Sequence, residues 1–324
     1  MSKNPIFQFE DAVRVQCKAS IMIEGLSGSG KSGLALAIAE VLADGDWSKV
    51  FDIDTENNSV RLFSGIGNSN GGSFGTFKVG NLTKDIGFSP SNFLAFRNAA
   101  VNNGAKVVIE DSISHAWMYQ GGVLDKVSNV QSTLRNPKDS YAAWGDAEVR
   151  AEKNKLLELI RDDRVHVITT VRVKEKQELS YNSDGKLEIK SLGEQQIQQA
   201  DLKYEPDLVL QMVSPGYRSD SKVVYPKAKV IKTRYAIFEV GEIYEFTKDL
   251  ILQLKEYLEE GVDPNELLQK QKDEYISAVK DYLDTHPNII TIWKELKKNA
   301  GYENTKLPDI PLSDLKELFV TLTT

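Results

Sequence analysis

The sequence predicts an α/β fold with a mainly parallel central sheet, helices on both of its faces and antiparallel strands at its edge. Three observations predict it. Short apolar runs of strand length alternate with longer helix-forming segments, which is the pattern of strand–helix–strand units. The run Ser20–Glu24 leads through a glycine-rich turn into the helix-forming segment Gly33–Ala43. Later, Val223–Phe246 alternates apolar and polar residues, which predicts one or two antiparallel edge strands.

Each parallel strand of the predicted sheet corresponds to one short apolar run. Between the second and third runs, Gly65–Gly75 is rich in glycine and asparagine and predicts a loop. After the fourth run, Gln177–Ser191 alternates around Asn-Ser-Asp-Gly, which predicts a hairpin with its turn at residues 182–185. The predicted strands are Ile21–Ile23, Val50–Ile53, Val107–Ile109, Val165–Val171 and Leu208–Met212.

From about Thr247 onward the pattern becomes helical and acidic. Residues 248–324 carry ten Lys/Arg against fifteen Asp/Glu, whereas Arg172–Arg234 carries twelve against nine. This change predicts two parts, an α/β domain over residues 1–247 and a small helical appendage over residues 248–324. The helices expected in the appendage are Leu250–Leu258, Glu266–Leu283 and Ile289–Lys298.

Composition excludes several classes of protein. With three histidines and one cysteine, the 324-residue chain has no ligands for a zinc cluster and no disulfide framework. No apolar run approaches the length of a membrane span, and the first residues form no apolar signal core, so we expect a cytoplasmic protein. The net charge of −7 confines any nucleic-acid contact to a local basic patch.

Residues 25–32 read GLSGSGKS, a complete G-x-x-x-x-G-K-S phosphate loop between a strand and a helix. Its glycines let backbone N–H groups surround phosphate oxygens, and the helix N-terminus adds partial positive charge. Lys31 is expected to reach the β- and γ-phosphates, and Ser32 to offer its hydroxyl to Mg²⁺. The motif therefore predicts ATP and Mg²⁺ as ligands. The predicted nucleotide-binding residues are Gly25, Ser27, Gly28, Ser29, Gly30, Lys31, Ser32 and Gly33.

A second metal anchor is predicted where the apolar strand Val107–Ile109 ends in carboxylates. Asp111 would hold a metal-bound water opposite Ser32, so these two residues form the predicted metal site. Glu110 comes one position earlier, and its side chain should therefore point to the other side of the strand. His115 follows closely and is a weaker candidate for contact with the site.

Two further residues are predicted to complete the catalytic set. Glu56 follows the second strand and would orient the attacking water as a general base; the alternative is a solvated acid at the start of a helix. Thr170 ends the fourth strand and would sense the γ-phosphate; the alternative is an ordinary β-branched strand residue. His166 alternates with apolar neighbours and is expected to be a packed or surface histidine.

This ordered set of motifs resembles the RecA-like ATPase core over roughly residues 15–245. In that family, a glutamate on the strand after the phosphate-loop helix is the catalytic base, which implies that role for Glu56. Recombinases carry a glutamine where this chain has Thr170, a departure that puts strand-exchange coupling in doubt. The segments that carry the resemblance are Gly25–Ser32, Asp54–Glu56, Ile109–Ser112 and Val171–Lys174.

Three other segments look like a narrower family of phage- and prophage-encoded RecA-like ATPases. They are Asp111–Trp117, Ala143–Asp146 and Tyr204–Leu210. Members of that family are associated with phage recombination or replication, and some related members anneal single strands. If the chain is phage-encoded, the resemblance implies the cytoplasm of a bacterial host.

A Lys-x-Arg pair near the end of the core, Lys232 and Arg234, also resembles RecA-like helicases. In those proteins the pair reaches into the site of the neighbouring subunit and stabilises the transferring phosphoryl group. The resemblance implies catalytic roles for both residues and an active oligomer, either a ring or a filament. The alternative is a basic edge strand that blocks aggregation.

The same resemblance implies that two loops line a path for single-stranded DNA. They cover about residues 119–140 and 174–199. Cations suit backbone phosphates and an aromatic ring suits bases, although acidic residues dilute the second loop, and a solvated hairpin is the alternative. The candidate DNA-binding residues are Lys126, Arg135, Lys174, Lys176, Tyr181, Lys186 and Lys190.

The function predicted from these observations is that of a Mg²⁺-dependent ATPase that binds single-stranded DNA as an oligomer in phage-type recombination, annealing or replication. One alternative is a small-molecule P-loop kinase. Another is a nucleotide-gated interaction protein whose acidic C-terminal appendage binds a host or phage factor.

Overall fold

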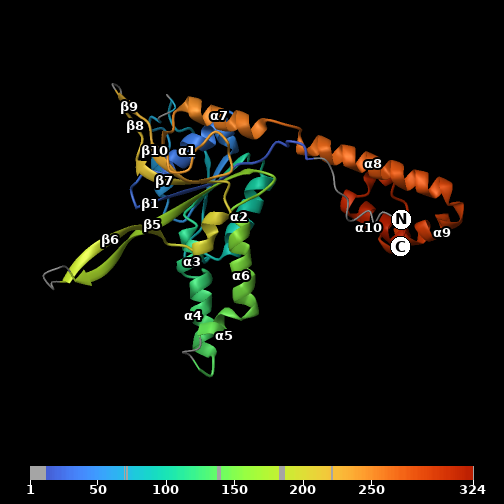
Figure 1. Cartoon of the computed structure of the whole chain (residues 1–324), viewed down its shortest axis with the longest axis horizontal. Helices are drawn as coiled ribbons and strands as arrows, with labels where there is room; N and C mark the ends of the chain where they lie inside the picture. The colour runs from blue at the N-terminus through green and yellow to red at the C-terminus, as the bar shows by residue number, and fades with distance from the viewer. Residues whose placement is uncertain are drawn as a thin grey trace. The chain divides into compact units, whose positions relative to one another are not determined.

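The computed structural model describes residues 12–68, 70, 72–136, 140–181, 187–219 and 222–323 (Figure 1). The chain divides into two compact units. The larger unit spans residues 18–258, and the smaller one combines residues 12–17 with residues 259–323. Among the described helices, none is both long and apolar enough to cross a membrane.

Nine strands of the described residues form the sheet of the larger unit, in the order β11-β10-β7-β1-β5-β4-β2-β3, with β6 paired to β5. The six strands from β7 to β3 are parallel, and β10 and β11 add antiparallel pairings at one edge. The strands are β1 (Ser20–Gly25), β2 (Val50–Asp54), β3 (Lys78–Asn81), β4 (Val107–Asp111), β5 (His166–Tyr181), β6 (Leu187–Gln196), β7 (Leu208–Ser214), β10 (Lys227–Thr233) and β11 (Ile243–Glu245). A separate pair consists of β8 (Tyr217–Ser219) and β9 (Lys222–Val224).

The predicted fold class is confirmed. All five predicted parallel strands are present, and the alternating segment Val223–Phe246 supplies the antiparallel edge strands. The predicted hairpin exists as the antiparallel pair β5–β6, in which Gln177 lies opposite Ser191. Its predicted turn at residues 182–185 lies outside the described residues. This hairpin extends beyond the rest of the sheet (Figure 1).

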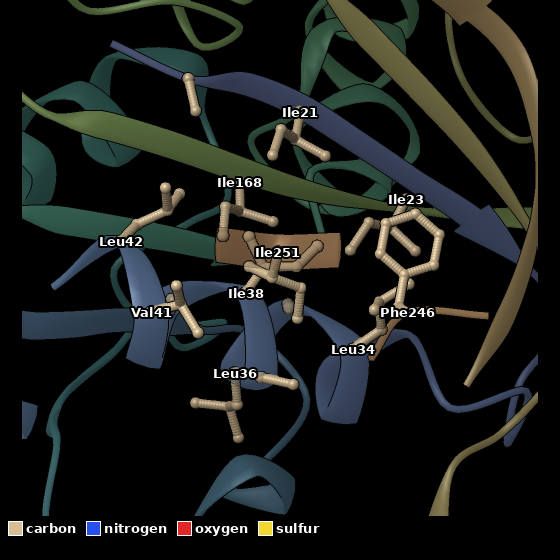
Figure 2. Packing of buried hydrophobic residues seen from close by; sticks show 14 of the residues in the cluster. Ile21, Ile23, Leu34, Leu36, Ile38, Val41, Leu42, Ile168, Phe246 and Ile251 are labelled. Atoms are coloured by element: carbon tan, nitrogen blue, oxygen red, sulfur yellow. The ribbon is translucent and has the colours of Figure 1, made fainter. Parts of the chain in front are cut away.

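Helices cover both faces of the sheet because successive strand residues point to opposite sides. Ile21 and Ile23 belong to the apolar cluster on the face of α1 and α7, whereas Met22 between them belongs to the cluster on the face of α2, α3 and α6. Figure 2 shows Leu34 and Ile38 of α1 close to the sheet residues of the first cluster. The helices of this unit are α1 (Lys31–Leu42), α2 (Pro90–Asn102), α3 (Ser114–Met118), α4 (Val123–Thr133), α5 (Ser140–Trp144), α6 (Ala147–Glu158) and α7 (Lys248–Glu259), with 3-10 turns η1 (Trp47–Lys49), η2 (Ser59–Phe63) and η3 (Ala200–Tyr204).

Helix α7 belongs to the larger unit rather than to the appendage. Its Ile251, Leu254 and Leu258 are spaced three and four residues apart and are buried in the same cluster as α1. The boundary between the units therefore follows Leu258, one helix later than the boundary expected from the change in charge after Thr247. The exposed face of α7 is acidic like the appendage, so composition alone assigned this helix to the appendage.

The smaller unit is a helical cluster. Trp293 is buried in it together with Val279 and Ile310. The chain after Lys298 continues into a helix that was not among the expected ones. The elements are α8 (Pro264–Thr285), α9 (Ile290–Asn299) and α10 (Leu312–Thr323), with 3-10 turns η4 (Pro287–Ile289) and η5 (Leu307–Asp309).

The register of the parallel strands brings their carboxyl ends together at one edge. Gly25, at the end of β1, pairs with Arg172 of β5. Asp54, at the end of β2, pairs with Asp111 at the end of β4. Because ligands of open parallel sheets bind at this edge, the fold places the predicted site residues where a ligand can reach them.

Candidate nucleotide site

The phosphate loop joins β1 to α1 in a conformation that requires glycine. Gly30 has a φ of 94°, in the left-handed region. A Cβ atom there would also lie 2.7 Å from the Cβ of Pro215, which is too close for any side chain. No side chain caps α1, so its first backbone N–H groups face the loop and can bind an anion.

Lys31 lies inside this loop. Its side chain is buried, and its Nζ donates hydrogen bonds to the carbonyl oxygens of Gly25, at 3.1 Å, and Leu26, at 2.9 Å. The loop thus carries a buried ammonium group beside backbone donors, an arrangement that favours phosphate oxygens.

Asp111 is the buried carboxylate of the site. Ser32 donates its hydroxyl to Asp111 Oδ2, and Thr170 donates its own to Oδ1 at 2.5 Å. Burial raises the pKa of Asp111 above its ordinary value, and the two hydrogen bonds oppose the rise. A hydroxyl and a carboxylate side by side are oxygen ligands of the kind that Mg²⁺ prefers, so the residues fit a metal ion whose other ligands are water and phosphate.

Glu56 lies at the same edge of the sheet, one turn beyond β2. Its backbone N–H donates to Asp54 Oδ1 at 2.6 Å. Its Oε1 accepts hydrogen bonds from Arg172 Nε at 2.9 Å and forms an ion pair with the terminal guanidinium nitrogen at 2.8 Å. Sequence reasoning placed Arg172 in a motif but gave it no role, because its partner is 116 residues away in the chain.

These groups surround one cavity of about 350 Å³. Lys31, Glu56 and Asp111, which were predicted to converge, all line it. Part of the cavity wall consists of apolar side chains from η2 and the loop after it. This wall was also missed, although apolar residues within a glycine-rich, polar segment were a signal for it. The complete lining is Ser27, Gly28, Gly30, Lys31, Ser32, Glu56, Ser59, Leu62, Phe63, Ile66, Asp111 and Arg172.

Comparison with family models decides the classification: residues 17–239 match the AAA_24 model, described as AAA domain. The chain belongs to the AAA domain family. It is therefore a P-loop NTPase domain, and the cavity at its phosphate loop is a nucleotide site. Comparison with curated proteins gives no match. Among solved structures, the chain is similar to the KaiC-like protein PH0186 of the archaeon Pyrococcus horikoshii OT3. The two are 15% identical, with a TM-score of 0.37, and the match covers 72% of this chain and 94% of the other.

In this AAA domain, Thr170 does not line the cavity. Its side chain is fully buried, and its hydroxyl holds Asp111. The structure therefore places the residue predicted to sense the γ-phosphate against the Asp111 carboxylate and outside the lining of the cavity.

Glu110 points away from the cavity, as its place in the strand predicted. It is fully buried and pairs with Arg97 NH2 at 2.6 Å. Arg97 also donates to the carbonyl oxygens of Glu158, at 2.9 Å, and Arg161, at 3.3 Å, at the C-terminal end of α6. This network ties α2 and α6 to the sheet of the AAA domain and leaves Asp111 as the carboxylate that faces Ser32.

The two histidines of the domain are buried. His166 Nδ1 accepts the backbone N–H of Ala19 at 2.9 Å, and burial lowers its pKa to about 3, which is the packed role expected for it. His115 contacts Tyr119 with 4.1 Å between the ring centroids and an angle of 53° between the ring planes. Burial and the nearby Arg172 lower the pKa of His115 to about 4, so it is neutral at physiological pH. It is not among the residues that line the cavity.

Lys232 and Arg234 lie at the opposite edge of the sheet. The end of β10 pairs with Leu208, which pairs in turn with Ile21 at the start of β1. Lys232 Nζ donates to the carbonyl oxygens of Tyr204 and Pro206. Arg234 lies one residue beyond β10 and pairs with Asp207 at 2.9 Å. Neither contributes to the nucleotide site of its own chain.

The candidate DNA-binding residues are spread over two places. Lys126 of α4 is paired with Glu148, which offsets its charge, whereas Arg135 after α4 and Lys174 of β5 are exposed. Lys176, Tyr181 and Lys190 lie on the β5–β6 hairpin, but the structure does not describe their side chains, and Lys186 lies outside the described residues. The structure therefore leaves the DNA path a prediction.

Proposed function

We propose that the protein is a Mg²⁺-dependent ATPase. The observation that supports this most is that Lys31, Glu56 and Asp111, from three separate segments, line one cavity with the phosphate loop. A phosphate-binding cation, a metal ligand and a carboxylate base are the groups that nucleotide hydrolysis requires.

Each residue has a definite part in this proposal. Lys31 and the loop amides bind the β- and γ-phosphates, while Ser32 and Asp111 hold Mg²⁺, which supplies positive charge to the phosphate oxygens. Glu56 accepts a proton as water forms a bond to the γ-phosphorus. The bond to the bridging oxygen breaks, and ADP leaves with its electron pair. The apolar wall of Leu62, Phe63 and Ile66 suits the flat nucleobase.

Phosphate release from ATP tests the proposal. The wild-type protein should release phosphate when Mg²⁺ is present. Lys31→Ala should raise the dissociation constant of ATP at least tenfold, because it removes the cation inside the loop. Glu56→Gln should keep ATP binding and lose about 100-fold or more in turnover, the contribution of a general base. An unchanged turnover in Glu56→Gln would contradict the role of Glu56, and transfer of phosphate to a small acceptor without release would favour a kinase.

The proposal extends to single-stranded DNA as the polymer on which the ATPase acts. Residues 172–234 as a whole are basic, although the β5–β6 hairpin within them carries at least as many acidic as basic residues, and Lys174 is exposed near its base. A role in phage-type recombination, annealing or replication rests on the resemblance of the motifs. Turnover should rise with single-stranded DNA and this rise should weaken with salt. Stimulation that is equal with RNA of the same length would contradict DNA as the specific polymer.

The proposal also includes an oligomer in which Lys232 and Arg234 act on the neighbouring site. Their position away from their own cavity suits residues that serve another subunit. To reach a neighbour, they must exchange their present contacts with residues 204–207 for the phosphates of that site.

A further inference from the structure

The ion pair between Arg172 and Glu56 stands at the centre of the nucleotide site. Arg172 contacts Glu56 Oε1 through two nitrogens, at 2.9 and 2.8 Å, and both side chains line the cavity. Glu56, the proposed base, is therefore bound to a cation in the structure. A carboxylate oxygen held in this way is occupied by the guanidinium and is not available to hydrogen-bond to a water molecule.

Arg172 is also placed to meet a terminal phosphate. Its backbone pairs with Gly25, the first residue of the phosphate loop, so the side chain starts from the strand beside that loop. Its guanidinium enters the same cavity as Lys31 and Ser32, which would hold the β- and γ-phosphates. The planar fork of arginine binds phosphate through two hydrogen bonds, as it binds carboxylate.

The surroundings fix the backbone of Arg172 and leave its side chain able to change partner. Its N–H donates to Ser114 Oγ at 2.9 Å, and its carbonyl oxygen accepts from the N–H of Ile197 at 2.8 Å. The side chain is 29% exposed, and the contact with Tyr119 Oη is long, at 3.4 Å. Partly exposed ion pairs are weak, so a phosphate dianion can compete with the single carboxylate of Glu56.

We propose that Arg172 binds the terminal phosphate of the nucleotide and thereby distinguishes a triphosphate from a diphosphate. Without nucleotide, its guanidinium holds Glu56. When a nucleoside triphosphate binds, the guanidinium moves to the γ-phosphate and releases the Glu56 carboxylate for the attacking water. A diphosphate has no terminal group at this place, so Glu56 stays held. This inference rests on the proposed ATPase function and assigns to Arg172 the sensing role predicted for Thr170.

Affinities for two nucleotides test the inference directly. The dissociation constants of ADP and of a non-hydrolysable ATP analogue are measured with Mg²⁺ on the full chain. Arg172→Ala should raise the dissociation constant of the ATP analogue at least tenfold and that of ADP less than twofold. The reason is that ADP lacks the phosphate that Arg172 would bind. Arg172→Lys keeps the charge without the fork and should fall between wild type and Arg172→Ala. The matched control is Arg164→Ala, which removes an arginine paired with Asp162 before the other end of β5, outside the cavity lining.

The outcomes separate this inference from the proposed function. Equal weakening of both nucleotides, or an unchanged ratio, in a folded Arg172→Ala protein would overturn the role of Arg172. If Arg172→Ala fails to fold, Arg172→Lys is measured in its place. An unchanged ratio of the two dissociation constants in that variant would likewise overturn the inference. If the wild type hydrolyses ATP and only the ratio does not move, the inference alone fails. A wild type that binds neither nucleotide would overturn the proposed function itself.

Discussion

Single carboxylates of the larger unit differ in what surrounds them, and their surroundings decide their chemistry. Asp111 is bound by two hydroxyl groups, Glu56 by a guanidinium at the cavity, and Glu110 by a buried guanidinium on the other side of the sheet. Asp52 differs from all of them. It is fully buried on β2, and neither of its oxygens has a hydrogen-bond partner among the described residues.

Asp52 gives a prediction on the pH dependence of stability. Burial, followed by the charges of Asp111 and Asp54, raises the pKa of Asp52 well above its ordinary value. The folded state therefore keeps a proton that the unfolded chain releases, so stability falls as the pH rises above about 4. Asp52→Asn cannot ionise and should raise the melting temperature at pH 8 by roughly 3–10 °C, since each pKa unit of the rise costs the wild type about 1.4 kcal/mol there.

At pH 4 the gain from Asp52→Asn should be much smaller, because the folded side chain is protonated there and the unfolded one is about half protonated. Thermal unfolding across this pH range is the measurement. Asp46→Asn is the matched control: the hydrogen bonds from Ser48 lower the pKa of this exposed side chain, so its replacement should not stabilise the protein at any pH. A gain in Asp52→Asn that is the same at pH 4 and pH 8 would show that ionisation is not its cause.

Among the elements, α7 yields a prediction on the boundary of the larger unit. Leu254 is fully buried against the core, whereas Leu252 on the same helix is 38% exposed. Leu254→Ala should lower the free energy of unfolding by about 2–5 kcal/mol, and Leu252→Ala by less than about 1 kcal/mol. Denaturant unfolding of the full chain compares the two. Equal losses would mean that α7 does not belong to this core.

The sequence predicted most of the helices and strands. The features that it did not predict depend on contacts between segments that are far apart in the chain. Strands such as Val107–Ile109 and the phosphate loop are encoded locally, by an apolar run or by glycines at fixed spacing. The pairing of Arg172 with Glu56 is not local, because only the order of strands in the sheet brings them together. The burial of Thr170 likewise depends on what packs around it, and a single strand cannot reveal that.

Within the candidate site, some residues could be predicted from the sequence and others could not. Lys31, Ser32 and Asp111 lie on strand ends or in a motif whose geometry is fixed, so their convergence could be predicted. The apolar wall of Leu62 and Phe63 belongs to a short 3-10 turn within a polar segment, and periodicity carries little information over five residues. The assignment of α7 failed because charge was given more weight than the spacing of its three buried residues.

For the whole molecule, the proposed oligomer can be tested by mixing inactive variants. Lys31→Ala cannot bind the phosphates, and the double variant Lys232→Ala/Arg234→Ala lacks the cations that would serve a neighbour. If those cations act between subunits, an equal mixture should recover activity at about a quarter of the interfaces, where an intact loop meets an intact pair. Phosphate release from the mixture is compared with that of each variant alone. A mixture no more active than its components would place both residues in a role within their own chain.

Strand β5 continues from the sheet into the hairpin, with a shift of pairing register between Glu175 and Gln177, and Arg172 lies on it at the cavity. Tyr181 is nine residues further along, roughly 30 Å at the rise of a strand. Over this length, a tilt of about 10° where the strand leaves the sheet would displace the far end of the hairpin by about 5 Å. The residue that lines the cavity and the outer end of the hairpin therefore lie on one continuous segment of chain.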